Sequence, residues 1–94
     1  MESRPEQTRK FVVSGRVQGV GFRYFVRQKA AEIGLAGWVR NRPDGTVEAE
    51  AGGSLEQLEA FEAALRAGPP LARVDHVAVA PAPPTRETAF RITG

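Results

Sequence analysis

The stretch that decides the fold reads VSGRVQGVGFR and spans residues 13–23. It overlaps a run of β-forming residues, which predicts a strand from Phe11 to Val17. From Phe22 to Ile33 the apolar residues recur every three or four positions, a pattern typical of an amphipathic helix. Gly34 stands where a residue in the left-handed conformation would end that helix. The segment is therefore predicted to join a strand to a helix through a glycine-punctuated turn.

A turn of this kind can bind an anion. The first amides of a helix have no partner within the helix and carry a partial positive charge. Gly19 and Gly21 would let successive N–H groups converge on one ligand, and Arg23 would lean back toward the helix start with a guanidinium that can bridge two phosphate oxygens. The segment is neither a Walker loop nor a dinucleotide fingerprint. On the residues alone, a structural turn followed by a solvated arginine explains it equally well.

The rest of the chain continues the alternation of strands and helices. Ser54 and Gln57 match a capping box at the start of a second helix, and Gly68 with the two prolines after it ends that helix. Further strands are predicted at 38–41, 47–51, 74–80 and 89–93. This order is β-α-β-β-α-β with a short final strand. It favours an α+β fold, a ferredoxin-like α/β sandwich with two helices on one face of a mixed or antiparallel sheet.

The composition fits one globular domain and excludes several classes of protein. The 94 residues are 41% hydrophobic and 26% charged, with a net charge of +2. Cysteine is absent, which excludes a disulfide framework, a thiolate nucleophile and cysteine-ligated zinc. We expect a flexible tail over 1–8 and a single domain over 9–94. No apolar stretch has the length of a membrane span or resembles a secretory signal, so we expect a soluble, cytoplasmic monomer with no membrane partner.

Few other residues suggest a site. His76 is the only histidine, and a surface or partly buried strand position is expected for it rather than a catalytic role. Glu48 and Glu50 alternate along a strand, so we expect a solvated face rather than an acid–base pair. With one histidine and no cluster of acids, we expect neither a metal site nor a cofactor. Trp38 is expected to pack, and Arg27 to face solvent.

Two sequence motifs favour an anion-binding turn over a purely structural one. Residues 13–23 match the first signature of the acylphosphatase family at every defined position. Residues 37–41, GWVRN, followed by Gly45, Val47 and Gly53, resemble its second signature with the same spacing. The chain is therefore similar to this family over all but its first seven or eight residues. The resemblance implies an enzyme that hydrolyses small-molecule acyl phosphates to a carboxylate and inorganic phosphate without a cofactor.

The resemblance also assigns roles to residues. In that family the loop amides of the first signature cradle the phosphate, and here they belong to Gln18, Gly19, Val20, Gly21, Phe22 and Arg23. By the same resemblance, Arg23 binds phosphoryl oxygens and Asn41 orients the hydrolytic water, so inorganic phosphate or sulfate should bind there too. Many relatives end with a basic residue after the last apolar one, whereas this chain reads Ile92-Thr93-Gly94. We expect this departure to affect stability or the edge of the site rather than the reaction type.

Three other functions are associated with this architecture or with this family. RNA-recognition domains share the architecture, but the strand from Val47 offers Val, Glu and Ala where those domains place aromatic residues, so we expect no nucleic-acid partner. Similar domains also begin a hydrogenase-maturation protein that is expected to act on carbamoyl phosphate. This chain lacks the cysteine motifs of that protein and stops after one domain, so a free-standing enzyme fits better. A degenerate member kept for partner binding is disfavoured because both catalytic positions are filled.

Overall fold

The computed structural model describes residues 6–94 as five strands and two helices. Their order is β1 (Gln7–Arg16), α1 (Phe22–Ile33), β2 (Ala36–Asn41), β3 (Val47–Gly53), α2 (Leu55–Ala67), β4 (Arg73–Pro81) and β5 (Phe90–Ile92). The predicted order β-α-β-β-α-β with a short final strand is confirmed.

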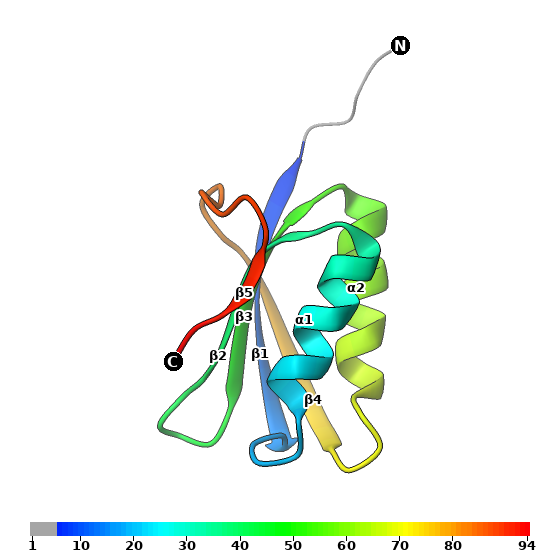
Figure 1. The fold of residues 1–94 in the computed structure, drawn as a ribbon, viewed down its shortest axis with the longest axis vertical. Coiled ribbons are helices and arrows are strands. Elements are labelled where there is room, and N and C mark those ends of the chain that lie inside the picture. Colours follow the sequence, from blue (N-terminus) through cyan, green and yellow to red (C-terminus); the bar gives the residue numbers. More distant parts are fainter. Residues whose placement is uncertain (1–5) are drawn as a thin grey trace.

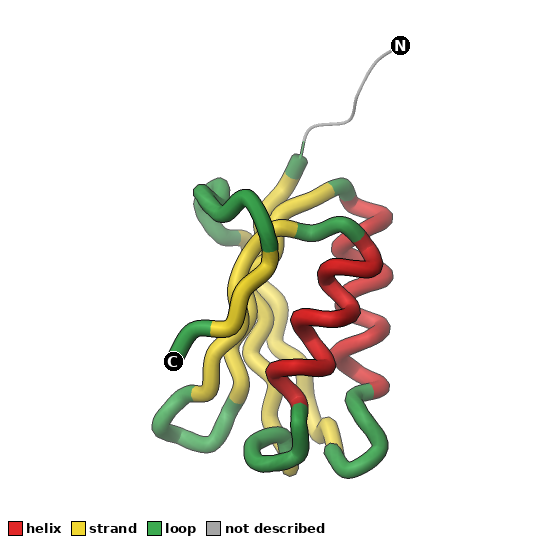
Figure 2. The backbone as a smooth tube through the Cα atoms, in the orientation of Figure 1, coloured by secondary structure: helices red, strands yellow, loops and turns green. Residues whose placement is uncertain are grey.

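The strands form one mixed sheet in the order β4-β1-β3-β2-β5. All neighbours are antiparallel except β2 and β5, which are parallel. Both helices lie on the same face of the sheet, as Figures 1 and 2 show, and the other face is left without a helix. The predicted ferredoxin-like sandwich is therefore confirmed.

The first strand begins earlier than expected. Gln7 and Thr8 already pair with Gly53 and Gly52 of β3, so both residues belong to the sheet rather than to a tail. A strand pair satisfies backbone groups on both sides, which outweighs the polar character of these residues. The remainder of the predicted tail, 1–5, lies outside the described residues.

The core lies between the sheet and the helices. Phe61 of α2 is fully buried and contacts two strands, with its ring centroid 5.2 Å from that of Phe11 and 5.8 Å from that of Phe90. Burying one such side chain contributes roughly 1.5–3 kcal/mol. Helix α1 buries Phe22, Val26 and Ala30 on one face, as its periodicity predicts. These contacts fix α1, and with it the loop that precedes α1, against the end of the sheet.

The expectation for Glu48 was wrong. Its side chain lies on the helix-free face, yet Glu48 is only 5% exposed, because Lys10 and Arg40 from the two neighbouring strands cover it. Burial alone would raise the pKa of this carboxyl. The hydrogen bond from Arg40 Nε (2.8 Å) and the charges of Arg40 and Lys10 outweigh burial and hold the pKa below its ordinary value. Glu48 thus links β1, β2 and β3 through its ion pairs with Lys10 and Arg40, and it is not part of a solvated face.

Candidate active site

The loop between β1 and α1 leaves its amides available to a ligand. Gly19 and Gly21 have φ angles of 75° and 78°, in the left-handed region that favours glycine. Within residues 6–94, no amide from 18 to 23 donates a turn, loop or capping hydrogen bond. Helix α1 has Gly21 at its N-cap, no side-chain cap and no acidic residue in its first turn. Such a loop presents unpaired N–H groups and the positive end of a helix, which together favour an anion.

A small cavity opens at this loop. Its volume is about 100 Å³, roughly the room taken by three water molecules in the liquid. The residues that line it are Val17, Gly19, Gly21, Phe22, Arg23, Tyr24 and Asn41. The structure therefore brings Arg23 and Asn41 together at one cavity, although they lie on α1 and β2. Of the other predicted loop residues, Val20 packs against the core and Gln18 points toward the β2–β3 hairpin.

Asn41 brings a polar atom that has no partner. It is the last residue of β2. Its side-chain oxygen Oδ1 is buried and accepts no hydrogen bond from the described residues. Leaving a buried acceptor unpaired costs about 1–3 kcal/mol, so such an atom points to a ligand or a water that donates to it.

Arg23 binds a main-chain oxygen rather than an acidic side chain. Its Nη1 donates to the main-chain oxygen of Gly94 at 3.0 Å, which holds the side chain against the segment after β5. Among residues 6–94 no Asp or Glu side chain lies within ion-pair distance of Arg23. A guanidinium has five N–H donors in a planar fork, so one that binds a main-chain oxygen through Nη1 keeps further donors for an anion.

Gln18 has a side-chain role that the sequence analysis missed. Its Nε2 donates to the carbonyl oxygens of Arg42 (2.8 Å) and Thr46 (2.9 Å). These two residues belong to the turn that joins β2 to β3, directly after Asn41. One amide group therefore links the loop between β1 and α1 to the hairpin that follows Asn41. No local pattern could reveal this, because the contact spans 24 and 28 residues.

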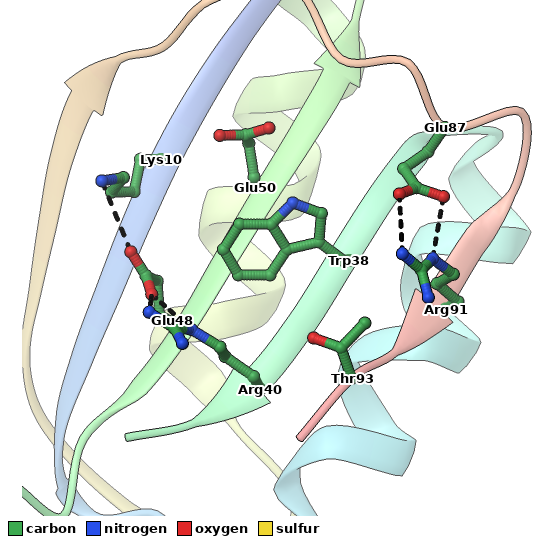
Figure 3. A pocket seen from close by; sticks show the side chains of 8 residues that line it. All are labelled: Lys10, Trp38, Arg40, Glu48, Glu50, Glu87, Arg91 and Thr93. Atoms are coloured by element: carbon green, nitrogen blue, oxygen red, sulfur yellow. Dashed lines mark hydrogen bonds and ion pairs between the residues drawn. The ribbon is translucent and has the colours of Figure 1, made fainter. Parts of the chain in front are cut away.

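A larger hollow on the helix-free face is less suited to an anion. It has a volume of about 470 Å³ and surrounds the indole of Trp38 (Figure 3). Its charged groups bind one another, since Glu48 holds Lys10 and Arg40 on one side and Arg91 donates twice to the carboxylate of Glu87 on the other. Cations that already hold a carboxylate attract a phosphate weakly.

No further residues of the described chain suggest a metal or membrane function. His76 is exposed on β4 and lines neither cavity. No group of three or more His, Cys, Asp or Glu residues within 6–94 is placed to hold a metal ion. In the same range, neither helix has the length and apolar character needed to cross a membrane.

Comparison with known proteins agrees with this geometry. The model of the acylphosphatase family matches residues 9–92. An acylphosphatase from Koribacter versatilis is 52% identical over 89 residues, which cover 94% of this chain and 81% of that protein. The crystal structure of acylphosphatase from Bacillus subtilis matches with a TM-score of 0.88 at 41% identity, over 93% of this chain and 98% of that one.

Two further solved structures are similar to this chain, and one of them is much longer than this chain. An acylphosphatase from Coxiella burnetii matches with a TM-score of 0.89 at 39% identity, over 94% of this chain and 93% of that one. The T. kodakarensis HypF structure matches with a TM-score of 0.83 at 37% identity, and this match covers 94% of this chain but 12% of HypF. Both motifs, the fold and the relatives therefore agree that this chain belongs to the acylphosphatase family.

Proposed function

We propose that this protein hydrolyses the carboxyl–phosphate bond of acyl phosphates, with Arg23 binding the phosphoryl group and Asn41 positioning the attacking water. The observation that carries the proposal is that Arg23, Asn41 and a loop of unpaired amides meet at one small cavity. The activity of the similar acylphosphatases supports it.

The phosphoryl group would bind at the start of α1. The amides of the loop, Gln18 to Arg23, are available to donate to its oxygens, and the guanidinium of Arg23 can donate to two of these oxygens at once. Phosphoryl transfer depends mainly on positioning and on stabilising charge on the equatorial oxygens. The loop and Arg23 can supply both functions.

The reaction needs little further chemistry. The leaving carboxylate has a conjugate acid with a pKa of about 4, so no general acid is required. The side chain of Asn41 cannot serve as a base near neutral pH, but its Oδ1 can accept a hydrogen bond from water and so orient it. The water oxygen attacks phosphorus, the bond from phosphorus to the acyl oxygen breaks, and the released proton passes to a phosphoryl oxygen.

Three finer properties belong to the proposal. Hydrolysis should be independent of metal ions, because Arg23 and the loop amides provide the positive charge that a metal would otherwise supply. Inorganic phosphate and sulfate should compete for the same cavity. The enzyme should act as a monomer in the cytoplasm on small-molecule substrates.

Benzoyl phosphate hydrolysis in the presence of a chelator tests the proposal. Replacing Arg23 by Gln, or Asn41 by Ala, should lower kcat/KM by roughly 100- to 1000-fold, the loss typical of one removed transition-state donor. Arg86→Gln is the control, because Arg86 is exposed and does not line the cavity. Full activity in both site variants, or loss of wild-type activity on chelation, would show that the mechanism is wrong.

A further inference from the structure

One exposed aromatic residue lies at the mouth of the cavity. Tyr24 is 63% exposed, and among residues 6–94 only Leu71 and Val79 are other large apolar side chains with comparable exposure. Tyr24 alone of these three lines the cavity that holds Arg23 and Asn41. An aromatic side chain with most of its surface in water contributes little to folding, and this one lies where a ligand of the cavity would meet it.

The orientation of the ring is set by its own helix. The guanidinium carbon of Arg27 lies 5.4 Å from the centroid of the Tyr24 ring, in a cation–π contact between residues three positions apart on α1. This contact restrains Tyr24 while leaving it exposed. A restrained ring loses less conformational freedom when a ligand packs against it.

The place of the acyl group follows from the place of the phosphoryl group. The cavity is small, about 100 Å³, so we place the phosphoryl group inside it and the acyl group outside it. In phosphoryl transfer the attacking water and the leaving oxygen lie on opposite sides of phosphorus. If the water sits at the buried Oδ1 of Asn41, the acyl group therefore points outward, past the exposed Tyr24.

We infer that Tyr24 determines which acyl groups the enzyme prefers, by providing a surface on which planar aromatic and large apolar acyl groups pack. The inference rests on the proposed function, because it names the substrate class of the same site. Tyr24 takes no part in the chemical step. It binds the acyl group to a similar extent before and during the reaction, so its removal should raise KM more than it lowers kcat.

The test compares benzoyl phosphate with acetyl phosphate in wild type, Tyr24→Ser and Tyr24→Phe. For Tyr24→Ser, the ratio of kcat/KM for benzoyl phosphate to that for acetyl phosphate should fall about fivefold, equivalent to ~1 kcal/mol, mainly through KM for benzoyl phosphate. Tyr24→Phe should keep the wild-type ratio, because it retains the ring. Val79→Ser removes an exposed apolar side chain far from the cavity lining and should also keep it.

The outcomes separate the two proposals. An unchanged ratio in Tyr24→Ser, or an equal loss with both substrates, would overturn the role of Tyr24 while leaving acylphosphatase activity intact. A wild-type protein that hydrolyses neither substrate would overturn the proposed function, and the inference with it. Inorganic phosphate should inhibit wild type and Tyr24→Ser equally, because phosphate carries no acyl group, and a weaker inhibition of the variant would mean that Tyr24 shapes the loop instead.

Discussion

The two helices begin in opposite ways. At the start of α2, the hydroxyl of Ser54 accepts a hydrogen bond from the amide of Gln57, and the Gln57 side chain accepts one from the amide of Ser54. At the start of α1, Gly21 has no side chain that could accept one, and the first turn holds no acidic residue. Both helices follow a strand and cover the same face of the sheet (Figure 1). The start of α2 is therefore closed by its own side chains, whereas the start of α1 has no side-chain cap, as the proposed phosphate site requires.

Arg40 and Arg23 differ in a similar way, because only Arg40 pairs with an acidic side chain. Arg40 holds the carboxylate of Glu48 at 2.7 Å, and both charges are largely used within the sheet. Arg23 donates through Nη1 to the main-chain oxygen of Gly94, and its other N–H donors have no hydrogen-bond partner among residues 6–94. The charged and polar groups that stabilise the fold have ion-pair or hydrogen-bond partners within the chain. At the cavity, the side-chain oxygen of Asn41 and the loop amides have no such partner among residues 6–94. The following experiments test this distinction.

Closing the open helix start should have the largest effect. Gly21→Asp places a carboxylate at the N-terminus of α1, where it would both cap the helix and repel phosphate. Its matched control is Gly21→Asn, because both side chains tolerate the left-handed region and neither Cβ meets a neighbour within 4 Å. We expect kcat/KM for benzoyl phosphate to be about 100-fold lower in the Asp variant than in the Asn variant. Equal activities in a steady-state assay would contradict an anion site at this helix start.

Removing the link between the loop and the hairpin should have the next largest effect. Gln18→Met keeps the length of the side chain but loses both hydrogen bonds, to Arg42 and Thr46. The two carbonyls still accept backbone bonds, so the free energy of unfolding should fall by only about 1 kcal/mol. Asn41 would be less well positioned, and kcat should fall about tenfold.

The control for this variant is Gln28→Met on the exposed face of α1, where glutamine contacts only Glu32. Urea denaturation and steady-state kinetics on both variants separate stability from activity. If Gln18→Met keeps the wild-type kcat, the bridge serves folding alone.

Opening the closed helix start should affect stability without affecting activity. Ser54→Ala removes the cap of α2 and should lower the free energy of unfolding by about 1 kcal/mol. In a domain of this size that corresponds to a fall in Tm of roughly 4–8 °C, measurable by circular dichroism. Hydrolysis of benzoyl phosphate at 25 °C should stay at the wild-type rate. A substantial loss of activity would mean that the α2 start also supports the site and that the contrast between the helices is false.

The smallest effect is expected at the charge cluster on the helix-free face. The pKa of Glu48 is lowered in the folded state, so its charge adds stability above the ordinary value of 4.5 and this contribution is lost as the pH falls below 4.5. Glu48→Gln should therefore lower the free energy of unfolding by up to about 1 kcal/mol at pH 7. The difference from wild type should shrink on acidification, as followed by urea denaturation at pH 7, 5 and 3. Glu50→Gln on the same face controls for the loss of a charge, and a difference for Glu48→Gln that does not depend on pH would contradict the ion-pair explanation.

Local features of the fold could be predicted from the sequence. The capping box at Ser54, the helical period from Phe22 and the glycine that ends α1 each depend on neighbouring residues only, and the structure has all three. The arrangement of the elements followed from their order, since few topologies suit it. The order of strands within the sheet required the structure, because pairing joins residues far apart in the chain.

What could not be predicted depends on contacts between distant segments. The alternation in β3 correctly indicated that Glu48 faces away from the helices, but it could not reveal that long side chains from two other strands cover the carboxylate. The Gln18 bridge and the contact of Arg23 with Gly94 were invisible for the same reason. That Asn41 lies at the same cavity as Arg23 was expected from family resemblance alone, and no spacing argument contained it.

The first strand lies in the middle of the sheet, and this affects how the molecule can be made. Val13 of β1 pairs with Val47 on one side and with Val77 on the other. A ribosome must therefore release the whole of β4, which ends at Pro81, before the centre of the sheet can close. The long segments between these strands lose conformational entropy before the strand contacts can form. Refolding is therefore expected to take milliseconds or longer in a stopped-flow experiment. The centre of the sheet thus forms only after the ribosome has released residues that follow β1 by more than 60 positions.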